Sequence, residues 1–90
     1  MVKKKKLYQK LVNNQKNVRF PDFLRVIEAF GFEQDRVKGS HRVYKHPTLQ
    51  DEFLVLQPSK SGEAKPYQIK QFLLLVETYD LRMDDNDDDD

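Results

Sequence analysis

Hydrophobic residues recur every three or four positions in three stretches of the chain, which is the spacing of one face of a helix. The first stretch, residues 4–13, carries leucine and valine between lysines and predicts a short amphipathic helix. The second, residues 21–30, begins with a proline and is followed by Gly31, which are common start and stop signals of a helix. The third begins at Pro66, and its hydrophobic stripe ends at Tyr79.

Between the second and third helices the hydrophobic spacing changes towards every second residue, which is typical of strands. Residues 32–38 and 41–46 predict two strands that are separated only by Gly39 and Ser40. A two-residue loop with glycine in the first place indicates a β-hairpin with a type II′ turn. A third strand is predicted at residues 53–57, after a polar loop.

The order helix, strand, strand, strand, helix, with an additional N-terminal helix, predicts an α+β fold. A three-stranded antiparallel sheet with the helices on one face would bury every hydrophobic stripe. The other face would be open to water, and we expect a binding or catalytic surface there. The predicted organisation is a basic N-terminal helical extension (1–18), one folded domain (19–83) and a disordered acidic tail (84–90).

Charge is distributed unevenly along the chain. It has sixteen basic and fifteen acidic residues, but six of the acidic residues are aspartates within the last seven positions. Without that tail, sixteen basic and nine acidic residues remain, a net charge of about +7. A domain this basic commonly binds phosphates or another acidic surface. The tail would either compete with RNA for the basic face or serve as a solubilising end.

Several protein classes are excluded or disfavoured by the composition. The chain has no cysteine, so disulfides, thiolate zinc sites and a cysteine nucleophile are all excluded. No hydrophobic run approaches the roughly 18 residues that a membrane-spanning helix needs. The basic start is not followed by the hydrophobic core and cleavage site of a signal peptide. We therefore expect a cytoplasmic protein, and no pattern in the sequence indicates a cofactor.

Both histidines lie in one short segment, RVKGSHRVYKHP, residues 36–47. His41 and His46 are five positions apart, so on a strand they point to opposite faces, and no acidic residue lies between them. A zinc site with three or four ligands is therefore not expected. Because His46 precedes a proline at the end of its strand, we assign it a structural or general electrostatic role.

The hairpin register predicts which side chains share a face. With glycine and serine in the turn, the facing pairs are Lys38 with His41, Arg36 with Val43, and Gln34 with Lys45. One face then carries Arg36, Lys38, His41 and Lys45, and the other face carries Arg42, Tyr44 and His46. A neutral histidine can act as a general base, and the neighbouring cations can bind a phosphodiester. From these residues alone, an RNA- or DNA-binding surface without catalysis is the simpler interpretation.

Four motifs occur in an order and spacing that resemble the HicA toxin family of bacterial toxin–antitoxin systems. They are the helix end FGF, the turn KGSH, the strand end YKHP, and KPYQIKQFL at the last helix, and the resemblance covers roughly residues 19–81. It implies a fold like that of double-stranded-RNA-binding domains. It also implies an mRNA interferase, which cleaves RNA independently of the ribosome with the histidine after Gly-Ser, here His41. The implied partner is a HicB-type antitoxin that masks the active site.

The preferred hypothesis is thus a metal-independent endoribonuclease toxin in which His41 acts as a general base or acid. The residues assigned to RNA binding are Arg36, Lys38, Gly39, Ser40, Arg42 and Lys45. Many family members have a second histidine at the position of Arg42, and an arginine there can still contact phosphate. The N-terminal helix would either extend the RNA surface or cover a sheet edge. The alternatives are an RNA-binding module without catalysis and an inactive toxin-like protein that only binds an antitoxin. The expected assembly is a homodimer or a toxin–antitoxin hetero-oligomer.

Overall fold

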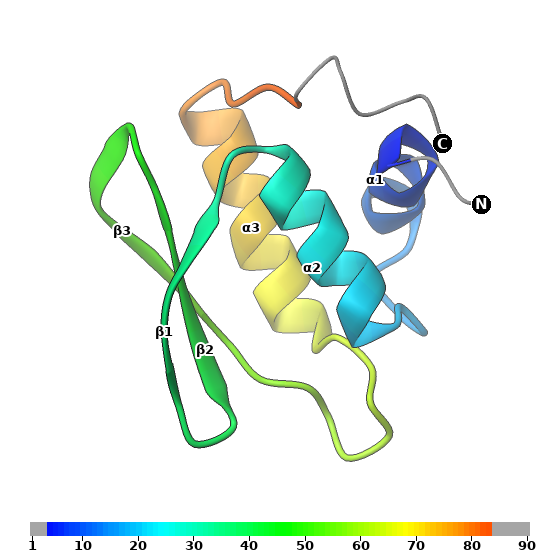
Figure 1. The fold of residues 1–90 in the computed structure, drawn as a ribbon. Coiled ribbons are helices and arrows are strands. Elements are labelled where there is room, and N and C mark those ends of the chain that lie inside the picture. The colour runs from blue at the N-terminus through cyan, green and yellow to red at the C-terminus, as the bar shows by residue number, and fades with distance from the viewer. Residues whose placement is uncertain (1–3, 84–90) are drawn as a thin grey trace.

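The computed structural model describes residues 4–83, which form a small sheet with helices packed against one of its faces (Figure 1). The elements are α1 (Lys4–Asn13), α2 (Phe20–Ala29), β1 (Glu33–Lys38), β2 (His41–His46), β3 (Leu49–Leu56) and α3 (Pro66–Thr78). This order confirms the predicted α+β class with its additional N-terminal helix. The acidic tail, and with it the two roles considered for it, lies outside the described residues.

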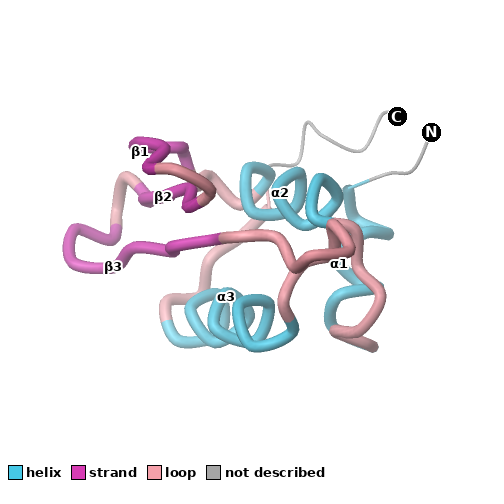
Figure 2. The backbone as a smooth tube through the Cα atoms, turned by 90° about the horizontal axis from the view of Figure 1, so that it is seen from below, coloured by secondary structure: helices cyan, strands magenta, loops and turns pink. Residues whose placement is uncertain are grey.

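The strands form one antiparallel sheet in the order β1-β2-β3, so β2 is central. Helices α2 and α3 cover one face of this sheet, and the view from below shows the other face uncovered (Figure 2). Tyr44 and Leu54 face each other across β2 and β3 and are buried under the helices. Phe53 and Val55 alternate with Leu54 and are about half exposed. The sheet therefore has one buried and one open face, as predicted.

An aromatic cluster occupies the space between the sheet and the helices. Phe72 of α3 is fully buried and meets the rings of Phe23, Phe30 and Phe32 edge to face. The three centroid distances are 5.8, 5.4 and 5.9 Å. This is a favourable arrangement for aromatic rings, because the positive edge of one meets the negative face of another. It joins α3, α2 and the start of β1 in one core.

Helix α1 packs on the helical layer and not on the sheet. Its Leu7 and Leu11 are buried in the common core, and the ring centroid of Tyr8 lies 4.9 Å from that of Phe30. In both views α1 lies beside α2 on the side remote from the strands (Figures 1 and 2). Of the two roles considered for this helix, covering a sheet edge is therefore wrong, because α1 packs against α2. Extension of the RNA surface stays a prediction.

Strand β3 begins four residues earlier than predicted. A turn of two residues follows β2, so that His46 pairs with Leu49, yet the preceding residue, Lys45, pairs with Phe53. Residues 50–52 are consequently left out of the ladder between β2 and β3, which is a large bulge. The polar sequence of this segment resembled a loop because it lacks the alternating pattern of a regular strand.

His46 of β2 forms a hydrogen bond with the backbone at the end of α2. Its Nε2 lies 2.9 Å from the carbonyl oxygen of Phe30, and its Nδ1 accepts the backbone N–H of Thr48 at 3.2 Å. Since Nδ1 is an acceptor, the proton is on Nε2, which donates to the Phe30 carbonyl. Gly31 allows this close approach: its φ is +96°, and a Cβ atom there would lie 3.0 Å from Nε2 of His46. The glycine that stops α2 is therefore also required for packing.

Replacing Leu11 by alanine should lower the free energy of unfolding by about 2–5 kcal/mol, because its side chain is buried in the core. Val12, the next residue of α1, is 50% exposed, and Val12→Ala should change that free energy by less than about 0.5 kcal/mol. Urea unfolding followed by circular dichroism measures both values. Equal effects of the two substitutions would contradict the packing of α1 on the domain.

His46→Ala should lower the free energy of unfolding by about 1–3 kcal/mol, because it leaves the Phe30 carbonyl without this hydrogen-bond donor. His41 is exposed, so His41→Ala should cost less than about 0.5 kcal/mol. Thermal unfolding of the two variants beside the wild type makes the comparison. A His46→Ala protein as stable as the wild type would show that this side chain does not anchor α2.

Candidate functional site

The tip of the β1–β2 hairpin positions the candidate catalytic residue. Gly39 has a φ of +63°, as the first position of a type II′ turn requires, and Lys38 faces His41 across it. Arg36 faces Val43. Both pairs confirm the predicted register at this end of the hairpin. Facing residues have Cβ atoms about 5 Å apart, so Lys38 is the immediate cross-strand neighbour of His41.

The predicted pairing of Gln34 with Lys45 is wrong, because β1 has a bulge at Asp35. Glu33 lies opposite Lys45 instead. The bulge does not move Lys45 from the open face, since it lies on β2 four residues from His41 and strand side chains alternate. Nothing in the polar sequence of β1 signals which residue leaves the ladder, so the bulge could not be foreseen.

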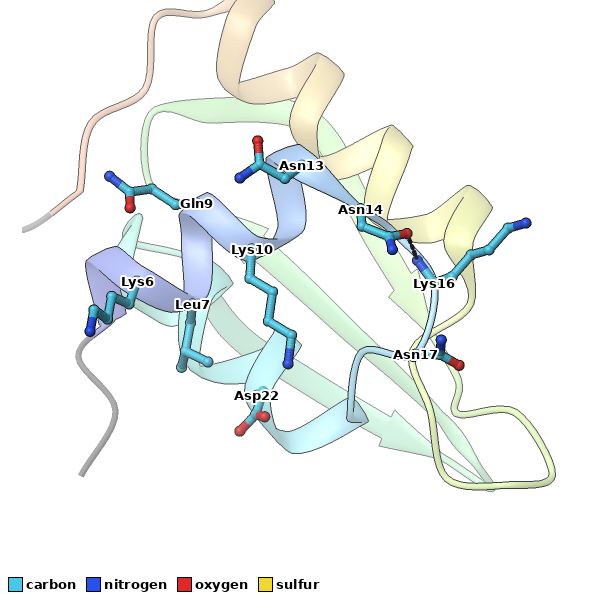
Figure 3. Close-up of a pocket in the computed structure, with 9 residues that line it drawn as sticks. All are labelled: Lys6, Leu7, Gln9, Lys10, Asn13, Asn14, Lys16, Asn17 and Asp22. Carbon is cyan, nitrogen blue, oxygen red and sulfur yellow. Dashed lines mark hydrogen bonds between the residues drawn. The ribbon is translucent and has the colours of Figure 1, made fainter.

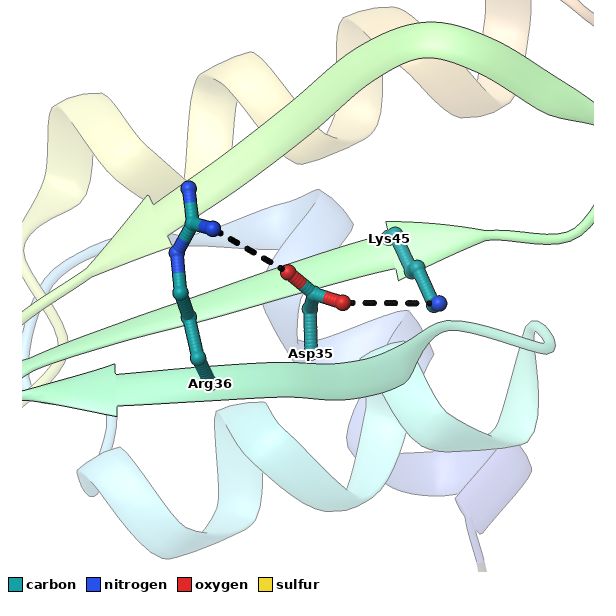
Figure 4. A network of polar contacts seen from close by, with 3 residues as sticks. All are labelled: Asp35, Arg36 and Lys45. Atoms are coloured by element: carbon teal, nitrogen blue, oxygen red, sulfur yellow. Dashed lines mark ion pairs between the residues drawn. The ribbon is translucent and has the colours of Figure 1, made fainter.

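Asp35, the bulged residue, lies between two cations of the open face (Figure 4). One carboxylate oxygen is 3.4 Å from Nζ of Lys45, and the other is 3.8 Å from a terminal nitrogen of Arg36. The side chains of Arg36 and Lys45 remain 69% and 49% exposed. Surface ion pairs contribute only about 0–1 kcal/mol, so breaking either pair costs little. Asp35 thus holds Arg36 and Lys45 close to each other, and both side chains remain exposed enough to turn towards another anion.

Two glutamines hold the turn in place. Nε2 of Gln57, the residue after β3, donates a hydrogen bond to Oγ of Ser40 at 3.0 Å. The backbone N–H of Gln57 donates to Oε1 of Gln68 on α3 at 3.3 Å, and Gln68 is buried. A chain of hydrogen bonds therefore connects α3 to the residue before His41. Neither glutamine could be predicted from the sequence, since a polar residue after a strand or in a first helical turn is too common to be a signal.

Arg42 lies on the other face of the sheet. Its guanidinium is 5.9 Å from the ring centre of Phe20 at the start of α2, a cation–π contact. The structure thus separates Arg42 from the cations around His41, and its role in RNA binding stays a prediction.

On the same face as Arg42, burial and the nearby carboxylate of Glu28 raise the pKa of Tyr44. The phenol therefore stays protonated at neutral pH and cannot act as a base.

A hollow of about 670 Å³ lies beside α1 and is separate from this surface (Figure 3). Its lining consists mainly of lysine and amide side chains: Lys6, Leu7, Gln9, Lys10, Asn13, Asn14, Lys16, Asn17 and Asp22.

Within residues 4–83, no three histidine, aspartate or glutamate side chains are grouped so that they could hold a metal ion. No helix in this part of the chain has the length and hydrophobicity to cross a membrane.

Comparison with known proteins assigns the family. The family model described as the HicA toxin of bacterial toxin–antitoxin systems matches residues 20–76. This segment contains α2, the whole sheet and most of α3, and it leaves α1 outside. The search of curated proteins and the search of solved structures gave no match. Because the matched segment is more than half of the chain, the protein belongs to the HicA toxin family of bacterial toxin–antitoxin systems.

Proposed function

We propose that this toxin is an mRNA interferase, an endoribonuclease that binds RNA on the open face of its sheet and cleaves it with the help of His41. The observation that carries the proposal is the pairing of His41 with Lys38 at the hairpin tip, with Arg36 next along the same face. Residues two apart on a strand lie about 7 Å from each other. One phosphodiester can therefore meet the imidazole and at least one of the two cations together.

In this proposal His41 moves a proton at the scissile phosphate. As a base it takes the proton of the attacking oxygen, which belongs to the 2′-hydroxyl or to water; as an acid it protonates the leaving oxygen. Lys38 and Arg36 bind the non-bridging oxygens and stabilise the charge that develops on them. The backbone amides of Gly39 and Ser40 are a further source of donors at the turn.

The same surface is the one that an antitoxin must cover to silence the toxin. Membership of a toxin–antitoxin family implies such a partner, and we propose that it is of the HicB type. The exposed cations beside His41 favour a partner with an acidic surface, because complementary charge speeds and orients association. We place the action in the cytoplasm, where the proposed substrate, mRNA, is found.

His41→Ala should reduce cleavage of a long unstructured RNA by about 10²- to 10⁴-fold, the usual contribution of a general acid or base. RNA affinity should change little, because phosphate binding depends on the cations. Both are measured on purified protein in EDTA, by gel analysis of the RNA and by filter binding. His46→Ala, assayed well below its unfolding temperature, is the matched histidine control and should keep its activity.

The result decides between the three functions considered for this chain. RNA binding by wild type and His41→Ala without cleavage by either would replace the nuclease by an RNA-binding module. Absence of RNA binding together with salt-sensitive binding of an antitoxin would leave a toxin-like protein that only binds its partner. Equal loss of activity in His41→Ala and His46→Ala would remove the special role of His41.

Lys38→Gln and Arg36→Gln should each weaken RNA binding and lower the slope of log affinity against log salt by about 0.7, the value for one phosphate contact with a single strand. The control is Arg82→Gln, because the side chain of Arg82 is 82% exposed and follows α3 on the helical side of the domain. It should leave the slope unchanged. Equal slopes for Arg36→Gln and Arg82→Gln would show that binding reflects overall charge and not the open face.

A further inference from the structure

We infer that a hollow at the other end of the open face binds an unpaired RNA base, which stacks on Phe53. The inference rests on the proposed ribonuclease function, because it states which feature of the RNA this surface recognises. Phe53 would then select where the RNA is cut without touching the reacting atoms.

Both neighbours of β2 leave the regular ladder near the hollow, β1 at the level of Val43 and Tyr44 and β3 at the level of Lys45 and His46. On one side β1 has the extra residue Asp35, and on the other side residues 50–52 of β3 have no partner on β2. Bulges bend strands and frequently lie next to binding sites. The hollow has a volume of about 320 Å³, and residues of all three strands and of the turn between β2 and β3 line it: Glu33, Lys45, His46, Pro47, Leu49, Gln50 and Phe53.

Phe53 offers an aromatic surface that the fold does not use. It is 46% exposed, whereas the other five phenylalanines are each 6% exposed or less. It lies directly opposite Lys45 on the open face, next to the half-exposed Val55. Aromatic side chains on an open sheet stack on the bases of single-stranded RNA, because an unstacked base has a free flat face. The position of Phe53 suits this role.

Polar groups around Phe53 complement a nucleotide. The amide of Gln50 has both a donor and an acceptor, and the carboxylate of Glu33 is an acceptor, so together they can bond the edge of a base. The ammonium of Lys45, now 3.4 Å from Asp35, can turn to the phosphate of the same nucleotide. A protein contact confined to this hollow fits less well than a base, because its two half-exposed hydrophobic side chains supply little of the roughly 800 Å² that a stable interface buries on each side.

The distance to the catalytic residue agrees with one continuous strand of RNA. Lys45 lies four residues from His41 along β2, about 13 Å away, and Phe53 is its neighbour on β3. A scissile phosphate at His41 therefore leaves room for a short single-stranded segment to run along β2 past Arg36 and place one base on Phe53. The base in that fixed position would set the sequence preference of cleavage.

The test uses short single-stranded RNAs that carry the fluorescent base 2-aminopurine at one position each, bound to the His41→Ala protein so that the RNA stays intact. Stacking on Phe53 should quench the fluorescence at one position. Adding Phe53→Leu should abolish this quenching and weaken binding about 5- to 100-fold, whereas Phe53→Trp should keep both. Leu74→Ala, which removes a side chain that is 63% exposed on α3, should have no effect.

Cleavage sites mapped in a long RNA separate this inference from the proposed function. Phe53→Leu in the otherwise wild-type protein should still cut RNA but lose the preference for one base at a fixed distance from the cut. Unchanged affinity, quenching and cut sites would overturn the inference and leave the ribonuclease intact. Base stacking that depends on Phe53, in a wild-type protein that does not cut RNA, would support the inference and reject the ribonuclease. A Phe53→Leu protein that loses only antitoxin binding would overturn the inference in favour of a protein contact.

Discussion

The alternation of β2 is the constraint on which the proposed site depends. Tyr44 lies in the core beneath the helices, and His46 is bonded to the carbonyl at the end of α2. Because side chains on a strand alternate, fixing these two residues inward directs His41 and Lys45 outward. A slip of one residue would expose Tyr44 and turn His41 and Lys45 away from the open face. The contacts that stabilise the fold are thus the same ones that expose the candidate catalytic histidine.

Local signals explain why much of the fold and the hairpin tip could be predicted from the sequence. Gly31 and the two helix-initiating prolines bound the helices, and the Gly-Ser turn alone places Lys38 opposite His41. The bulges at Asp35 and residues 50–52 could not be predicted, because an extra residue among polar neighbours leaves no periodic trace. The hollow beside Phe53 lies where β3 leaves the ladder, so it could not be predicted either, although the phenylalanine itself is plain in the sequence.

Helix α1 stabilises the domain from outside the segment that defines the family. The family match begins at residue 20, yet Leu7 and Leu11 belong to the same core as α2 and α3. Small domains bury a modest fraction of their surface, so one further helix changes that balance appreciably. Because α1 packs on the helices, it adds to the core without narrowing the access to His41.

The described chain begins and ends on one side of the molecule. Lys5 and Tyr8 near its start border the same hollow as Leu81 and Met83 near its end, and this hollow lies at the helical layer. Both ends are therefore points of attachment that leave the sheet clear. A fusion partner or a surface linker joined next to residue 4 or residue 83 would be attached on the helical side, with the open face directed at the solution. In such an arrangement, capture of RNA and capture of an antitoxin could be compared on the same immobilised molecule.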